Sequence, residues 1–98
     1  MSLSTQRYAP TSISVVMLGE LQRTVGRNLR AYREARGLSQ EAFAERLGVH
    51  RTYMGSVERG ERNLTLQTVE RLAFQLSVQP HDLLSSDLPP ARAVPADR

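Results

Sequence analysis

The clearest pattern of apolar and polar positions lies in residues 37–63, which read GLSQEAFAERLGVHRTYMGSVERGERN. Ser39 is a helix-capping residue and helix formers follow it, so a helix is expected to begin there. Phe43, Ala44 and Leu47 fall on one face of that helix. Gly48 can adopt the backbone conformation that ends it, which predicts an amphipathic helix of about two turns.

A second short helix is expected directly afterwards, from about Arg51 to Arg59. Val49 and His50 form the connecting turn, and His50 occupies the position of the helix cap. Met54 and Val57 are the residues expected to face inward. Two helices this short, joined by so tight a turn, must cross steeply, which is the arrangement of a helix-turn-helix.

A longer helix is expected before this pair, from about Gly19 to Arg36. Gly26 weakens its middle by about 1 kcal/mol relative to alanine, so a start nearer Thr24 is the alternative. The residues of its inward face recur at spacings of three and four, and they are Leu21, Val25, Leu29 and Tyr32.

Two further helices are expected after the pair. Thr65 caps the first, and Pro80 opens the second, which is short and includes Leu83 and Leu84. The inward stripe of the first consists of Leu66, Val69, Leu72, Ala73 and Leu76.

The predicted fold is therefore all-α, a compact five-helix domain over residues 19–84 with the helix-turn-helix at its second and third helices. Residues 1–18 are expected to form an N-terminal arm, in which the apolar stretch 13–18 suits either a strand or an extension of the first helix. Residues 85–98 are rich in Pro, Ala and Ser and are expected to be a disordered tail.

On the segments LSQEAFAERLGV and VERGERN, the chain resembles the Xre and Cro type of helix-turn-helix regulators. Among these it is similar to the controller proteins of restriction-modification systems, whose recognition helices often read much like RTYMGSVERGERN. The resemblance covers roughly Val25 to Leu84. It implies a domain like that of lambda repressor, which binds double-stranded DNA and regulates transcription.

The resemblance also implies roles for three residues. Arg33 and Glu58 lie where the family usually places a partly buried ion pair that orients the recognition helix. Gln40 matches the family's phosphate-binding glutamine at the first turn of the first motif helix. The alternatives are two unrelated surface charges and a glutamine that merely favours the helix.

The second motif helix carries the candidate DNA contacts, because its exposed face is slim, polar and cationic. Arg51 and Thr52 lie on its first turn and are expected to contact bases, and Ser56 is a candidate for a second base edge. Tyr53 either contacts the DNA backbone or packs on the motif. The residues expected to contact backbone phosphates are Arg59, Arg62 and Asn63.

Composition agrees with a small DNA-binding protein. The net charge is +3, and residues 21–62 hold nine arginines against five acidic residues. The chain has no cysteine, neither histidine belongs to a metal-ligand pair, and no apolar run could span a membrane. We therefore expect a cytoplasmic protein that is not an enzyme and needs no metal or other cofactor.

A symmetric homodimer is expected, because one recognition helix makes too few base contacts to select a single genomic site. Its surface is expected in residues 76–84, where Leu76, Val78, Leu83 and Leu84 exceed what the domain needs inside, or in residues 13–18. The alternative function is an antitoxin or coactivator-like module that keeps the fold but mainly contacts a protein, such as a toxin or polymerase.

Overall fold

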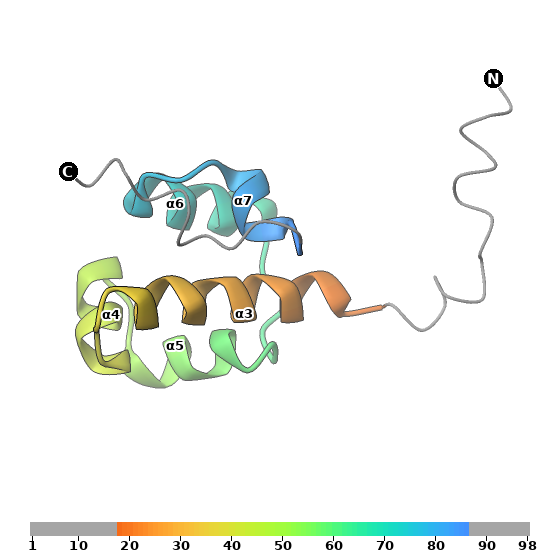
Figure 1. Cartoon of the computed structure of the whole chain (residues 1–98). Coiled ribbons are helices and arrows are strands. Elements are labelled where there is room, and N and C mark those ends of the chain that lie inside the picture. The colour runs from red at the N-terminus through yellow and green to blue at the C-terminus, as the bar shows by residue number, and fades with distance from the viewer. Residues whose placement is uncertain (1–17, 87–98) are drawn as a thin grey trace, which may run out of the picture.

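The computed structural model describes residues 18–86, and Figure 1 shows the five helices of this part, with no strand in it. None of these helices is long and apolar enough to cross a membrane. The all-α, five-helix fold expected from the sequence is confirmed. The helices are α3 (Glu20–Ala35), α4 (Gln40–Leu47), α5 (Arg51–Glu58), α6 (Leu66–Leu76) and α7 (Pro80–Leu84).

Helix α3 runs through the middle of the domain and separates two pairs of helices (Figure 1). The pair formed by α4 and α5 lies on one side of it, and the pair formed by α6 and α7 lies on the other. The domain therefore presents α5 on the side opposite to α6.

Local capping explains where most of these helices begin. The side chains of Ser39 and Thr65 accept hydrogen bonds from Ala42 N and Thr68 N, both at 3.0 Å. His50 caps α5 as expected, because its Nδ1 accepts from Thr52 N at 3.0 Å. The first helix begins at Glu20, so the alternative start near Thr24 is wrong.

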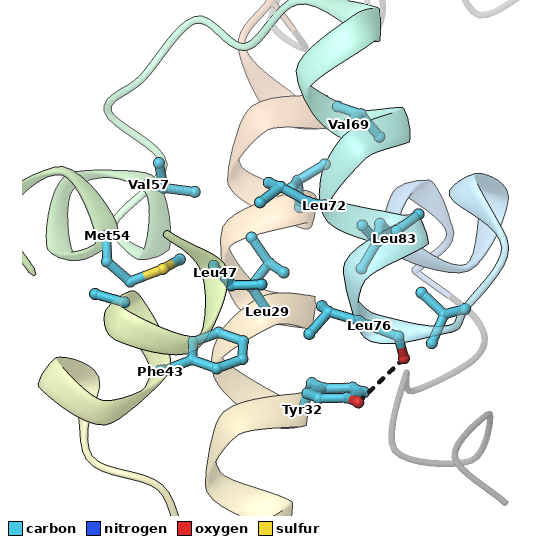
Figure 2. Close-up of a cluster of buried hydrophobic side chains, with 14 residues drawn as sticks. Leu29, Tyr32, Phe43, Leu47, Met54, Val57, Val69, Leu72, Leu76 and Leu83 are labelled. Atoms are coloured by element: carbon cyan, nitrogen blue, oxygen red, sulfur yellow. Dashed lines mark hydrogen bonds between the residues drawn. The ribbon is translucent and has the colours of Figure 1, made fainter. Parts of the chain in front are cut away.

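Apolar side chains from all five helices meet in one core, and Figure 2 labels ten of them. Tyr32 is 2% exposed, and its hydroxyl donates to the Leu76 carbonyl at 3.1 Å. This bond joins α3 to the end of α6. The buried apolar residues are Val25, Leu29, Tyr32, Phe43, Ala44, Leu47, Met54, Val57, Val69, Leu72, Ala73, Leu76, Val78 and Leu83.

Two residues expected to face inward lie on the surface instead. Leu21 is 63% exposed and Leu66 is 77% exposed. Each lies in the first turn of its helix, at the edge of the bundle, where the neighbouring helices no longer cover it. The helical periodicity continues beyond the packed region, so it places these two residues on the inward face although no neighbouring helix covers them.

The expectation that residues 76–84 provide spare apolar surface is also wrong. Leu76, Val78 and Leu83 are only 4%, 9% and 0% exposed, because α7 folds back onto α3. Asn28 of α3 secures this contact by donating through Nδ2 to the Leu83 carbonyl at 2.8 Å. Within this segment, Leu84 is the only leucine left partly exposed.

Gly26 allows α5 to approach α3 closely. A Cβ atom at this position would collide with the Val57 carbonyl oxygen and would lie 2.6 Å from that of Glu58. Both obstacles are backbone atoms of α5, which cannot move aside as a flexible side chain could. The glycine that weakens α3 locally is therefore required by the contact between the two helices.

We predict that Gly26→Ala destabilises the domain by about 1–3 kcal/mol, although alanine favours the helix itself by about 1 kcal/mol. Chemical denaturation followed by circular dichroism measures the free energy of unfolding. Gly55→Ala is the matched control, because it is also helical but its Cβ would meet only side-chain ends, of Arg59 and Gln40, at 3.2 Å. The control should keep or slightly raise stability, and an equal loss in both variants would contradict this explanation.

Candidate nucleic-acid interface

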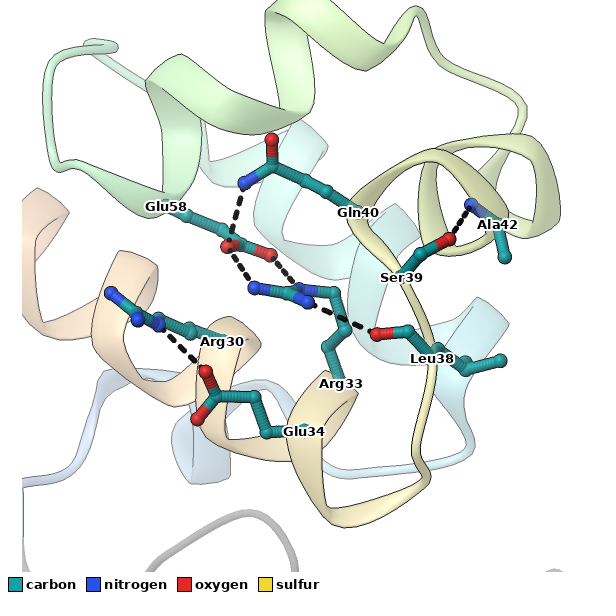
Figure 3. A network of polar contacts seen from close by, with 8 residues as sticks. All are labelled: Arg30, Arg33, Glu34, Leu38, Ser39, Gln40, Ala42 and Glu58. Carbon is teal, nitrogen blue, oxygen red and sulfur yellow. Dashed lines mark hydrogen bonds and ion pairs between the residues drawn. The ribbon is translucent and has the colours of Figure 1, made fainter.

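A network of charged and polar side chains joins α3, α4 and α5 (Figure 3). The guanidinium of Arg33 donates to both carboxylate oxygens of Glu58, at 2.8 Å from Nε and 3.1 Å from Nη2. Its Nη1 also donates to the Leu38 carbonyl at 3.0 Å. The side chains are 13% and 3% exposed, so the pair is largely shielded from water.

Gln40 completes this network from the first turn of α4. Its Nε2 donates to Glu58 Oε1 at 3.0 Å, so the carboxylate receives donors from two helices. The hydrogen bond to Glu58 raises the pKa of Arg33 above its ordinary value, which keeps the guanidinium charged. The network fixes the end of α5 relative to α3 and to the start of α4.

The first turn of α5 carries two exposed polar residues, Arg51 and Thr52. His50 holds the backbone of this turn through its capping bond to Thr52 N. The side chains of Arg51 and Thr52 lie on a rigid helix end and are open to solvent. They are therefore available to a ligand that approaches this end of α5.

Tyr53, Ser56 and Arg62 form a cluster. The guanidinium carbon of Arg62 lies 4.9 Å from the centre of the Tyr53 ring. Arg62 Nε also donates to Ser56 Oγ at 3.0 Å, and Ser56 Oγ donates to the Tyr53 carbonyl at 2.8 Å. Tyr53 also packs against the core with part of its surface. The cluster holds Arg62 beside the outer face of α5.

The loop after α5 carries the remaining candidate residues. Arg59 and Glu61 form a two-point ion pair, with 3.0 Å from Nε to Oε2 and 3.1 Å from Nη2 to Oε1. Asn63 is exposed on the same loop. A partner for Arg59 is not predictable from the sequence, because the distance between its side chain and that of Glu61 depends on how the turn at Gly60 folds.

Apart from Gln40 of α4, the candidate DNA contacts thus lie on α5 and in the loop that follows it. Arg51 and Thr52 lie at the start of α5, the Tyr53 cluster lies beside its middle, and Arg59 and Asn63 follow its end. The side chains of Arg51 and Thr52 are exposed to solvent. The arginines after the helix are already held by protein partners.

A family model described as a helix-turn-helix domain matches residues 24–84. This range covers all of the helix-turn-helix and the two helices that follow it, together with most of α3. The match spans more than half of the chain and includes every candidate residue of the interface.

The chain is 47% identical to the control protein C.SmaI of Serratia marcescens, over 67% of this chain and 79% of that protein. Among solved structures it is similar to the restriction-modification controller protein C.AhdI of Aeromonas hydrophila, at 44% identity and a TM-score of 0.56, covering 63% of this chain and 94% of that chain. It is also similar to the structure of the hypothetical transcription factor NHTF from Neisseria, at 38% identity and a TM-score of 0.60. This match covers 74% of this chain and 79% of that chain. The chain therefore belongs to the helix-turn-helix family of DNA-binding transcriptional regulators, in which its relatives include restriction-modification controller proteins.

Proposed function

We propose that this regulator inserts α5 into the major groove of an inverted-repeat operator and acts there as a homodimer. The observation that carries the proposal is the pair of exposed side chains, Arg51 and Thr52, on the capped first turn of α5. In helix-turn-helix proteins the first turn of the second helix contacts base edges. The proposal includes a cytoplasmic location and no catalytic role.

Arg51 is proposed to read a base. A guanidinium can donate two hydrogen bonds to the O6 and N7 atoms of guanine, and the Thr52 side chain can hydrogen-bond a base or contact a thymine methyl. Ser56 lies one turn further along, but its hydroxyl is engaged by Tyr53 and Arg62. Donation to a base by Ser56 therefore requires its hydroxyl to give up the hydrogen bond to the Tyr53 carbonyl, whereas one of its lone pairs is still able to accept.

The remaining cationic and polar residues are proposed to contact the phosphate backbone. Arg62 and Tyr53 present a cation stacked on a ring beside α5, and Arg59 and Asn63 follow on the exit loop. Gln40 uses its amide to bind Glu58, and the second hydrogen of that amide remains for a phosphate. Contacts of this kind fix the register of the protein on the duplex without reading sequence.

For the dimer, we propose a surface that shares only Leu84 with the two surfaces expected from the sequence. A hollow of about 200 Å³ lies between the first turn of α3, the loop after α5 and the start of α6. Its apolar lining includes Leu21, Leu64, Leu66 and Leu84, of which Leu21 and Leu66 are largely exposed.

The hollow lies beside the loop that leaves α5, since Asn63 and Leu64 line it. A two-fold axis next to it would bring the ends of two α5 helices toward each other and present both on one face. This is the arrangement that two adjacent half-sites require. Of residues 13–18, the other surface expected from the sequence, only Leu18 belongs to the described part of the chain, and it is exposed.

Replacing Arg51 with alanine is expected to lower affinity for the preferred duplex by about 1–3 kcal/mol and to relax preference at one base position. Selection from random duplexes followed by anisotropy titration measures both quantities. Arg71→Ala, which removes an exposed arginine from α6, is the control of equal charge. If the Arg51 variant kept its affinity and its base preference, Arg51 would not be a base-reading residue.

Arg62→Ala should weaken binding almost equally on all sequences and reduce the salt slope of log K by about one unit, because a phosphate contact releases counterions. Titrations at several salt concentrations, on the selected duplex and on an unrelated one, give the slope. An unchanged slope with altered sequence preference would instead assign Arg62 to a base edge.

Leu66→Glu is expected to shift the dimer toward monomer, whereas Phe74→Glu should leave it unchanged. Both residues are exposed on α6, at 77% and 83%, so neither change should disturb the core, but only Leu66 lines the hollow. Sedimentation equilibrium measures the dimer constant. Dissociation caused by Phe74→Glu alone would move the surface to the outer face of α6. A wild-type monomer that bound an inverted repeat one to one would exclude the dimer.

A further inference from the structure

The Arg59–Glu61 pair lies at the point where the chain leaves the recognition helix. Gly60 takes the left-handed conformation with a φ of 77°, and Glu61 N donates to the Ser56 carbonyl at 2.9 Å. The turn therefore fixes the backbone of Glu61 against the last turn of α5. This position brings its carboxylate beside Arg59.

Glu61 occupies the donors with which Arg59 would bind a phosphate. Its two oxygens accept from Nε and Nη2, which form one edge of the guanidinium fork. A phosphate group uses the same two-point geometry on an arginine. The hydrogen bond with Arg59 lowers the pKa of the Glu61 carboxyl, so the competing group is ionised at neutral pH.

The pair is accessible to DNA and can be broken. The side chains of Arg59 and Glu61 are 60% and 57% exposed, in contrast to the shielded pair between Arg33 and Glu58. An exposed ion pair adds little stability, so it is not needed to hold the domain together. Stability therefore does not explain why the Glu61 carboxylate lies on the face that is proposed to bind DNA, which is itself negatively charged.

We propose that Glu61 competes with the DNA backbone for Arg59 and thereby lowers the affinity of the protein for every DNA sequence. The inference rests on the proposed placement of α5 in the groove. While the pair is closed, Arg59 contributes no net charge to the interface. The sequence-independent part of binding is then smaller, and retention on DNA depends more on the contacts of Arg51 and Thr52.

The expected size follows from counterion release. One phosphate contact adds about 0.9 to the salt slope on duplex DNA, which corresponds to about a fivefold gain in affinity near physiological salt. Freeing Arg59 should therefore produce an increase of about this size on any duplex. The ratio between the preferred sequence and unrelated DNA should stay the same, because phosphates carry no sequence information.

The test uses Glu61→Gln in the full chain. Its affinity for an unrelated duplex and for a duplex selected from random DNA is measured by anisotropy over a series of KCl concentrations. We expect about fivefold tighter binding to both duplexes and a salt slope steeper by about one unit. Glu34→Gln is the matched control, since it also removes one negative charge and breaks an exposed pair, with Arg30, but lies on α3. The control should change neither the affinity for the two duplexes nor the salt slope.

A double-mutant comparison separates competition for Arg59 from simple repulsion between Glu61 and phosphate. In an Arg59→Ala background, Glu61→Gln should have no effect if Glu61 acts through Arg59. An effect that persists in this background would overturn the proposed competition.

The remaining outcomes are equally decisive. Unchanged or weaker binding by Glu61→Gln, with a wild-type protein that binds DNA, would contradict the role of Glu61 and leave the proposed function intact. A gain confined to the selected duplex would assign Arg59 to a base edge and overturn the inference. Absence of binding by the wild type to any duplex would instead refute the proposed function, and this inference with it.

Discussion

The contact between α3 and α5 is the constraint on which the rest of the domain depends. Gly26 lets the backbones of the two helices come close at Val57 and Glu58, and Arg33, further along α3, fixes the same end of α5 through its ion pair with Glu58. A buried pair of this kind contributes orientation more than net stability, because desolvation of the two charges offsets most of their attraction. Removal of one partner would leave the other charge stranded. These two features fix α5 against α3, and with it the candidate DNA contacts that α5 carries.

The polar side chains along the outer face of α5 and just after it differ in whether they have protein partners. This difference suggests that they contact different parts of the DNA. Arg51 and Thr52 at its start are exposed and held only through the backbone, which suits contacts with base edges. At its end, Arg59 and Arg62 are engaged by Glu61 and by the Tyr53–Ser56 pair. Of these two arginines, Arg59 has an anionic partner, whereas the partners of Arg62 are neutral. We therefore propose that base contacts are made from the first turn of α5 and phosphate contacts from the residues that follow its end.

The sequence pattern predicts features that depend on neighbouring residues in the chain, such as helix caps and the inward faces of helices. The cap at His50 and the inward faces of α4 and α5 follow from capping preference and helical spacing, and the structure bears them out. Longer-range features were not predictable in this way. Leu66 fits the inward periodicity but lies beyond the reach of neighbouring helices, and Leu83 is buried because α7 folds back to Asn28. A glycine is required at position 26 because the backbone of α5 packs against it. The pairing of Arg59 with Glu61 depends on the turn at Gly60.

The central claim is that the protein contacts DNA through α5 and the loop that follows it. The most direct test is to titrate the isotope-labelled protein with a duplex selected from random DNA and to measure the chemical-shift changes of the backbone amides. We predict that the largest changes occur over residues 51–56 at the start of α5 and in the loop 59–63. Amides around Phe74 on the far side of α3 should shift little. Saturating binding that shifts α6 and leaves the first turn of α5 unchanged would contradict the account.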